Sequence, residues 1–306
     1  MHERRRASIE PTPTPQSLRQ TRPFFSIVLE PPVDTETLII SILIGAAGGL
    51  LGGLFGIGGG IIIIPLLTMA QGSNPHLYQA ASLVAAIAVS LGSIPRHIRA
   101  RAIRWHFAWK TIPISLVAVA IGVWISNSIT DPQLLERIFA AFLLYVAAAE
   151  LLQRMRANKE EGPPGKSTVT PLEHTGWKPA AIVGSLMGSL AGMLGVGGGV
   201  IAVPLMRVVN GFSLRVTIAT SAFLILPTVV AGALMKYSTL SLVHSPAGDP
   251  LTMTQALWLA AALAPGAFFG AMFGASLVHR LPQKQLAVAF AILCVMLSIR
   301  MAGIGG

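Results

Sequence analysis

The sequence predicts an all-α membrane protein, a polytopic bundle of about eight transmembrane helices built from two four-helix repeats whose first helices are broken at glycines. Composition is the first observation, because 53% of the residues are hydrophobic and only 11% are charged. The charges are also segregated, with none from Thr37 to Pro95, and one segment recurs in the second half. Soluble domains carry about 25% charged residues, which disfavours a very apolar soluble core.

The uncharged runs give the expected crossings, since a helix needs roughly 20 apolar residues to span hydrocarbon. The polar, proline-rich residues 1–36 are expected to form a disordered cytoplasmic tail. Residues 154–177 read as a linker between repeat 1 (37–153) and repeat 2 (178–306). The expected crossings lie at about 37–56, 77–95, 107–126, 134–153, 178–196, 213–236, 253–278 and 282–301.

Basic residues predict the orientation. With eight crossings, 17 lysines and arginines fall on the side of the N-terminal tail and 5 on the other. Basic loops stay in the cytoplasm, so both termini are predicted to be cytoplasmic. The same rule accounts for the net charge of +10 without a nucleic-acid partner. Cys294 is the only cysteine and cannot form a disulfide within the chain.

An internal repeat is the most informative feature. Gly45–Ser82 aligns without a gap onto Gly184–Ser221, 139 residues later, with 14 identities in 38 positions. Duplicated halves are common in secondary transporters. An even number of crossings in each half predicts parallel repeats, related by an axis along the membrane normal, whereas an odd number would predict inverted ones.

Glycines recur at every fourth position in three of the expected crossings. Such stripes of small residues let helix backbones approach closely in lipid, so we expect them to serve packing. They are Gly45, Gly49 and Gly53; Gly184, Gly188 and Gly192; and Gly266, Gly270 and Gly274.

A second kind of glycine cluster ends the first helix of each half. The sequences are Gly56-Ile-Gly-Gly-Gly60 and Gly195-Val-Gly-Gly-Gly199, each followed by four further residues and then a proline. Each glycine weakens a helix by about 1 kcal/mol relative to alanine, so both helices should break there. Proline suits the first turn of a helix, so short helices are expected from about Pro65 and Pro204.

These breaks are the predicted binding site for a small anion. Unwound backbone at membrane depth is tolerated where protein buries it or where it lines a wet cavity, and exposed amides at a helix start attract anions. Serines at the matching position of both halves would add donors. Tight packing or a hinge is the alternative for the glycines, and a bond to its own helix for each hydroxyl. The candidate residues are Gly56, Gly58, Gly59, Gly60, Ser82, Gly195, Gly197, Gly198, Gly199, Thr220 and Ser221.

The paired glycine motifs, each with its following proline and an Ala-X-Ser element, resemble the TauE/SafE family of sulfite exporters over about residues 37–301. The resemblance implies a transporter of the bacterial inner membrane that moves sulfite, sulfonates or related sulfur oxyanions, generally outward. The family pattern has a Thr-Ser pair, which Thr220 and Ser221 match, whereas Ala81 precedes Ser82 in the first half. This departure puts symmetric coordination in doubt.

No cofactor or metal is expected, because the histidines show no metal-ligand spacing, and no nucleophile or acid–base pair lies on the crossings. The expected partners are the lipid bilayer, a small anion and a coupling ion. Glu150, a carboxylate inside the crossing at 134–153, is expected to form a salt bridge at the interface rather than to relay protons. Arg207 and Arg215 are expected to be interfacial. A passive anion channel and a structural membrane protein are the alternative functions.

Overall fold

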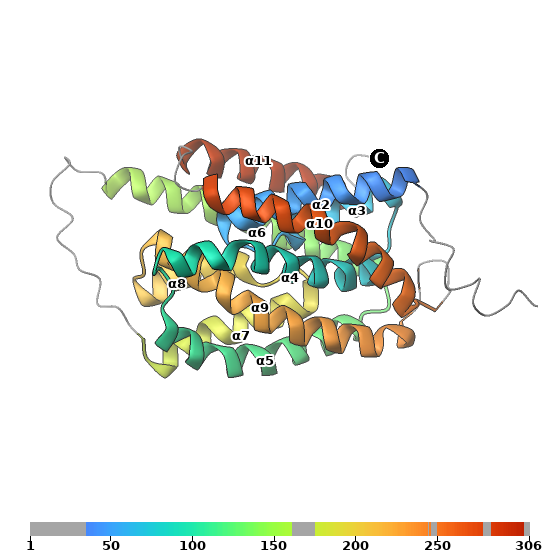
Figure 1. Ribbon diagram of the computed structural model, residues 1–306, viewed down its shortest axis with the longest axis horizontal. Helices are drawn as coiled ribbons and strands as arrows, with labels where there is room; N and C mark the ends of the chain where they lie inside the picture. The colour runs from blue at the N-terminus through green and yellow to red at the C-terminus, as the bar shows by residue number, and fades with distance from the viewer. Residues whose placement is uncertain (1–34, 161–174, 244, 246–249, 278–282, 303–306) are drawn as a thin grey trace, which may run out of the picture. The chain divides into compact units, whose positions relative to one another are not determined.

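The computed structural model describes residues 35–160, 175–243, 245, 250–277 and 283–302 (Figure 1). This part is all-helical and contains no β-strand. The predicted tail up to residue 34, most of the predicted linker, His244 and the side chain of Glu150 lie outside it. The helices are α2 (Thr35–Phe55), α3 (Gly60–Gln71), α4 (Pro75–Arg99), α5 (Trp105–Ser128), α6 (Pro132–Glu160), α7 (Trp177–Leu194), α8 (Gly199–Asn210), α9 (Leu214–Thr239), η1 (Leu240–Leu242), α10 (Met253–Leu277) and α11 (Gln283–Met301).

Each of the eight expected crossings coincides with one long helix. Six helices of the described part are long and apolar enough to cross a membrane, namely α2, α4, α5, α6, α9 and α10. Their outward faces carry large apolar side chains, such as Trp124 and Phe273, which are 70% and 60% exposed. Such surfaces suit lipid rather than water. The chain is therefore a multi-pass helical membrane protein.

Helices α2 and α3 form a hairpin that turns back inside the protein. The Gln71 amide donates to Ser41 Oγ at 3.4 Å, and Gly48 packs against Ile63, so α3 returns beside α2 in the opposite direction. Helix α3 begins at Gly60, not near Pro65 as predicted. Its residues Ile61–Ile64 are almost completely buried. Protein surrounds this segment, where a helix satisfies the backbone hydrogen bonds that water cannot. Helix α8 likewise starts before Pro204.

Helices α4 and α9, which correspond under the 139-residue alignment, run antiparallel. His76 at the start of α4 contacts Lys236 near the end of α9, whereas the Arg104 amide, beyond the end of α4, donates to Thr220 near the start of α9. Parallel repeats would require these helices to run in the same direction. That prediction is wrong, because it treated each glycine-broken hairpin as a full crossing.

We call the two ends of the bundle the Pro75 end and the Arg99 end, after the first and last residues of α4. Helix α2 begins at the Pro75 end, since α3 returns to that end and Tyr78 Oη donates to Gly72 O at 2.8 Å. The count of basic residues that placed both termini in the cytoplasm put the start of α2 on the same side as the basic loop after Arg99. Because the hairpin places the start of α2 and this loop at opposite ends of the bundle, that count of 17 to 5 does not hold.

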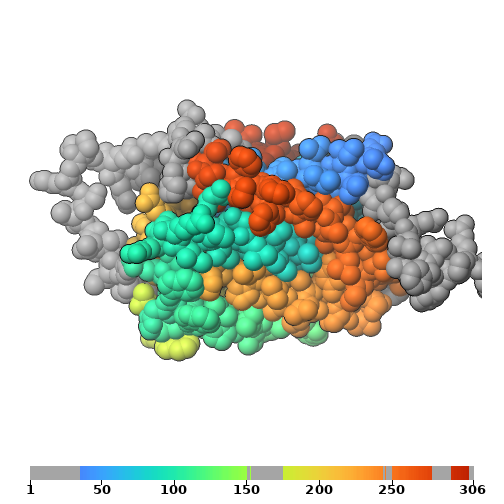
Figure 2. All heavy atoms as spheres, viewed as in Figure 1, coloured from blue at the N-terminus to red at the C-terminus, as the bar shows by residue number. Residues whose placement is uncertain are grey.

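Interlocked glycine stripes join helices from different halves. A Cβ built on Gly49 of α2 would lie 2.2 Å from Ala267 O of α10, and one built on Gly188 of α7 would lie 2.4 Å from Ser115 O of α5. The contacts advance by four residues on both helices, which makes each pair parallel. Figure 2 shows α10 crossing this face between α2 and α4. The predicted packing role of the stripes is confirmed.

Candidate anion site at the helix breaks

Both predicted helix breaks are present, and glycine is required at three positions of each. Gly58 and Gly59 have φ angles of 86° and 81°, and Gly197 and Gly198 have φ angles of 82° and 76°. This left-handed region is costly for residues with a Cβ atom. Gly56 and Gly195, which end α2 and α7, also have positive φ. The tips are buried, including Ile57 and Val196.

The two breaks lie against each other in the protein interior. A Cβ on Gly60 would lie 2.6 Å from Gly195 O, and one on Gly199 would lie 2.4 Å from Gly56 O. Gly58 and Gly197 face each other, since a Cβ on either would be 3.4–3.5 Å from the Cα of the other. The sequence predicted two similar breaks, and the structure brings them into direct backbone contact.

One serine hydroxyl joins each break to a helix of the opposite half by a hydrogen bond. Ser82 Oγ of α4 donates to Gly195 O at 2.7 Å, and Ser221 Oγ of α9 donates to Gly56 O at 2.7 Å. Each also lies near a carbonyl of its own helix, at 3.0 Å and 3.2 Å. The matching serines therefore join the candidate site, where they hold the carbonyls that end α2 and α7.

Thr220 does not join this cluster. Its Oγ1 accepts a hydrogen bond from the Arg104 amide at 3.1 Å, just before α5 begins. The hydroxyl therefore caps a neighbouring helix instead of facing the breaks. Ala81, which replaces threonine in the first half, is also fully buried. The missing hydroxyl consequently leaves the serine contacts of the two breaks alike.

Amide groups at the tips are the strongest chemical feature of the site. Helix α3 starts at Gly60, and its Ile62 and Ile63 amides donate to Gly59 O. Among the described backbone hydrogen bonds, none is donated by the amides of Gly58 or Gly59. Helix α8 repeats the pattern, with Ile201 and Ala202 donating to Gly198 O. Two helix N-termini with spare amides thus meet at one place, and helix N-termini carry partial positive charge.

The charged side chains nearest in sequence to the second break are exposed on the surface. Arg207 and Arg215, at the end of α8 and the start of α9, are both exposed, which fits the predicted interfacial position. Trp105, Trp109 and Trp177 are exposed at the starts of α5 and α7, as expected for residues at a membrane interface. Among the described residues, no group of three or more His, Cys, Asp or Glu side chains is placed to hold a metal ion.

One buried charge was missed by the sequence reasoning. Lys236 is one of the 17 basic residues counted above on the side of the N-terminal tail, yet its side chain is 0% exposed in α9. The repeat carried a signal for it, because the 139-residue offset, extended without a gap, places Lys236 on His97 of α4. Matching ionisable residues inside two long helices are unusual in a membrane protein.

Comparison with known proteins agrees with the fold and the motifs. The family model for the sulfite exporter TauE/SafE matches residues 41–301. The chain belongs to this family. A probable membrane transporter protein of Haemophilus influenzae is 30% identical over 86% of this chain and 97% of its own length. The probable membrane transporter protein YunE of Bacillus subtilis is 24% identical over 87% of this chain and 97% of its own length.

This chain is also similar to part of a larger protein. The probable membrane transporter protein MamO of Paramagnetospirillum magneticum is 26% identical over 85% of this chain, which spans only 44% of MamO. No solved structure matches the chain. The family model and these relatives therefore place the chain among proteins that are described as membrane transporters.

Proposed function

We propose that this transporter exports a small anion, such as sulfite, a sulfonate or a related sulfur oxyanion, across the bacterial inner membrane. The substrate would bind where the two glycine breaks meet. The class of substrate is taken from the family description, and the site from the geometry of the breaks.

The observation that carries the proposal is the meeting of two helix N-termini in a buried, uncharged place. Amides at the starts of α3 and α8 have the polarity to replace the water lost by an oxyanion. The tips carry no lysine or arginine, so the anion is held by dipoles and short hydrogen bonds. A fixed cation would bind it more tightly and slow its release.

The hairpins also support an arrangement of two inverted repeats, residues 37–153 and 178–306. Each half would contribute one hairpin that turns back inside the protein and three full crossings, α4–α6 and α9–α11. An odd number of crossings reverses the second half relative to the first. The breaks would then be related by an axis in the membrane plane, an arrangement that places the site at the repeat interface in many secondary transporters.

We propose that the Arg99 end faces the cytoplasm. Within the described part, the loop after α4 and the starts of α5, α7 and α9 are rich in basic residues, whereas the Pro75 end has few. Cytoplasmic loops collect lysine and arginine. The basic residues at the Arg99 end include Arg96, Arg99, Arg101, Arg104, Lys110, Lys178, Arg207 and Arg215, and those at the Pro75 end are Arg137, Lys236 and Arg300.

Reconstituted protein tests the proposal. Proteoliposomes would be loaded with sulfite, sulfate, thiosulfate or methanesulfonate, and efflux would be followed with an anion-specific assay. We expect efflux of at least one sulfur oxyanion, reduced strongly by Ser82→Ala and by Ser221→Ala. Ser90→Ala is the matched control, because Ser90 is also buried in α4 but its hydroxyl makes no hydrogen bond to either break.

Two outcomes would count against this function. If no sulfur oxyanion moves through the wild-type protein, the substrate class is wrong. If Ser82→Ala and Ser221→Ala behave like Ser90→Ala in folded protein, the breaks are packing elements. The passive-channel alternative uses the same site, and accumulation of anion against its gradient separates a carrier from a channel.

A further inference from the structure

Lys236 lies in a polar cluster that the proposed anion site does not use. Its Nζ atom is 3.0 Å from His76 Nδ1, 3.2 Å from Ser126 Oγ and 2.7 Å from Asn127 Oδ1. These partners come from α4 and α5, and the lysine comes from α9. Three acceptors match the three hydrogens of an ammonium group.

The charge on this ammonium has no carboxylate among its three partners. A buried ionised group is costly unless it is paired, and ionisable residues inside membrane helices mark ion and proton pathways more often than structural sites. The cluster is satisfied as a hydrogen-bond network but not as an ion pair. An amine in this position can therefore give up its proton without leaving a bare carboxylate behind.

His76 connects the lysine to the protein surface. Because the ammonium donates to Nδ1, the imidazole carries its own hydrogen on Nε2, which lies 3.2 Å from Ile129 O. An imidazole of this kind can accept a proton on one nitrogen and release one from the other. Ile129 also lines a cavity, so the outer nitrogen of the buried histidine is one hydrogen bond away from a residue of the cavity wall.

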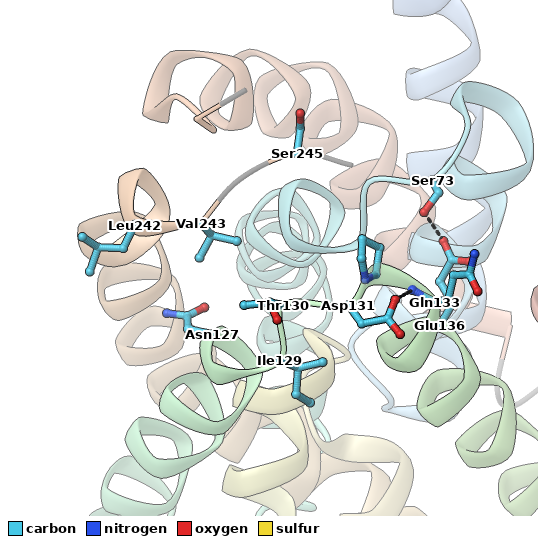
Figure 3. A pocket seen from close by; sticks show the side chains of 11 residues that line it. Ser73, Asn127, Ile129, Thr130, Asp131, Gln133, Glu136, Leu242, Val243 and Ser245 are labelled. Carbon is cyan, nitrogen blue, oxygen red and sulfur yellow. Dashed lines mark hydrogen bonds between the residues drawn. The ribbon is translucent and has the colours of Figure 1, made fainter. Parts of the chain in front are cut away.

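That cavity has a volume of about 610 Å³ and lies at the Pro75 end, between the end of α5, the start of α6 and the segment after α9 (Figure 3). Asn127, which binds Lys236, is part of its wall, and the carboxylates of Asp131 and Glu136 lie on it as well. Two carboxylates make the cavity attractive to protons and repellent to anions. It suits proton exchange better than entry of the anionic substrate.

We propose that Lys236 and His76 form a proton-binding site that exchanges a proton with the Pro75 end of the protein. The lysine would pass a proton from Nζ to His76 Nδ1, and the proton on Nε2 would leave to water in the cavity. Rotation or tautomer exchange then returns the ring to its Nε2–H form, with the Lys236 amine neutral and one proton released. Uptake runs in reverse and returns one proton to the amine.

The proton site is continuous with the second glycine break. Ser126 Oγ, which accepts from Lys236, donates to Gln79 Oε1 at 2.9 Å. The backbone of Gln79 packs on Gly195, since a Cβ on that glycine would lie 2.8 Å from Gln79 Cα. Loss of the lysine proton changes which groups donate hydrogen bonds in the series Lys236, Ser126 and Gln79. The coupled ion would then be a proton moving opposite to the anion, a step that rests on the proposed function.

Other ionisable groups near the cluster must be considered in any pH experiment. From α4, these are His76 and Tyr78; from α9, Tyr237; and from the cavity wall, Asp131 and Glu136. From α5, the facing residues Ser126 and Asn127 do not titrate. Among the described residues of η1 there is no ionisable side chain. Variants of Lys236 leave all these groups in place.

The first test needs no substrate. Proton uptake by purified protein would be titrated between about pH 9 and pH 5, a range in which exposed lysine and arginine stay charged. Lys236→Arg keeps a charge that is not lost at any pH in this range. We expect the wild-type protein to take up one more proton than Lys236→Arg or Lys236→Met. Arg137→Gln, which removes an exposed cation from the same end, should match the wild type.

Equal proton uptake by the wild-type protein and both folded Lys236 variants would overturn the proposal, because the lysine would then be a permanent charge. His76→Gln provides a further check, since glutamine can accept from Lys236 but cannot relay. This variant should take up the Lys236 proton more slowly in stopped-flow pH jumps.

The second test addresses coupling. Sulfite efflux from proteoliposomes would be measured with the membrane potential clamped and an imposed pH gradient. We expect the wild-type protein and Arg137→Gln to respond to the gradient, and Lys236→Met and Lys236→Arg to lose that response. A full response in Lys236→Arg would mean that only the charge matters, and it would refute proton coupling. Absence of efflux from the wild type, together with normal proton uptake, would refute the proposed substrate and leave the proton site standing.

Discussion

Close approach of the two breaks and left-handed backbone are separable requirements, and Gly60→Ala isolates the first. Gly60 has an ordinary backbone conformation, but its added Cβ would lie 2.6 Å from Gly195 O and 2.9 Å from Val196 Cα. Ordinary contacts begin at about 3.4 Å, so the two tips must separate by roughly 0.8 Å. Overpacking of this size costs about 1–3 kcal/mol.

Thermal unfolding in detergent measures that cost. For a chain of this size, each kcal/mol shifts Tm by about 2–4 °C, so we expect Gly60→Ala to lower Tm by about 2–12 °C. Anion efflux should fall as well, because separated tips no longer present their amides to one point. Gly176→Ala is the matched control, since its Cβ would meet nothing closer than 3.7 Å and its φ is −70°.

The comparison has a clear negative result. If Gly60→Ala unfolds at the same temperature as Gly176→Ala and transports at the same rate, the tips are not in the close contact described. Gly72→Ala supplies the complementary case, because nothing lies within 4 Å of its Cβ but its φ is 85°. Its loss of stability should therefore reflect backbone strain alone, about 1–3 kcal/mol, with transport retained.

Three further substitutions probe the helix contacts. Gly49→Ala should prevent close packing of α2 on α10 and lower Tm by more than Gly60→Ala does, because its Cβ would lie 2.2 Å from a backbone oxygen; an unchanged Tm would contradict the interlocked stripes. Ser298→Ala removes the bond to Ala140 O that joins α11 to α6 and should cost about 1 kcal/mol without affecting efflux. Thr220→Val should weaken the start of α5 at Arg104 by a similar amount. Slower efflux at unchanged Tm in Thr220→Val would instead place that hydroxyl in the transport site.

The sequence predicted the helices and the breaks well for identifiable physical reasons. A spanning helix needs a run of apolar residues, so the charge-free segments located α4, α5 and α10 within a few residues of their ends. Clustered glycines and the stripes left local signatures that did not depend on the rest of the chain. The breaks at Gly56 and Gly195 were therefore visible before any helix was placed.

The directions of the helices and the contacts between them were harder to predict. Hydropathy does not distinguish a hairpin that turns back from a full crossing, and this one ambiguity reversed the relation between the halves. The same error hid the cluster around Lys236, because His76 reaches it only if α4 and α9 run antiparallel. A lysine at the end of an apolar run normally extends its charge to the interface. The only signal in the sequence is the match of Lys236 with His97 in the repeat, which marks the position as unusual but does not give the direction of the side chain.

The pairing of α2 with α10 has a consequence for biosynthesis. Helix α2 leaves the ribosome long before α10, which packs on its glycine face. Helices α5 and α7 likewise come from different halves of the chain and pack on each other. A chain interrupted after α6 would thus hold an unfilled groove in the lipid. Separately produced halves should therefore be degraded when alone and rescued when made together.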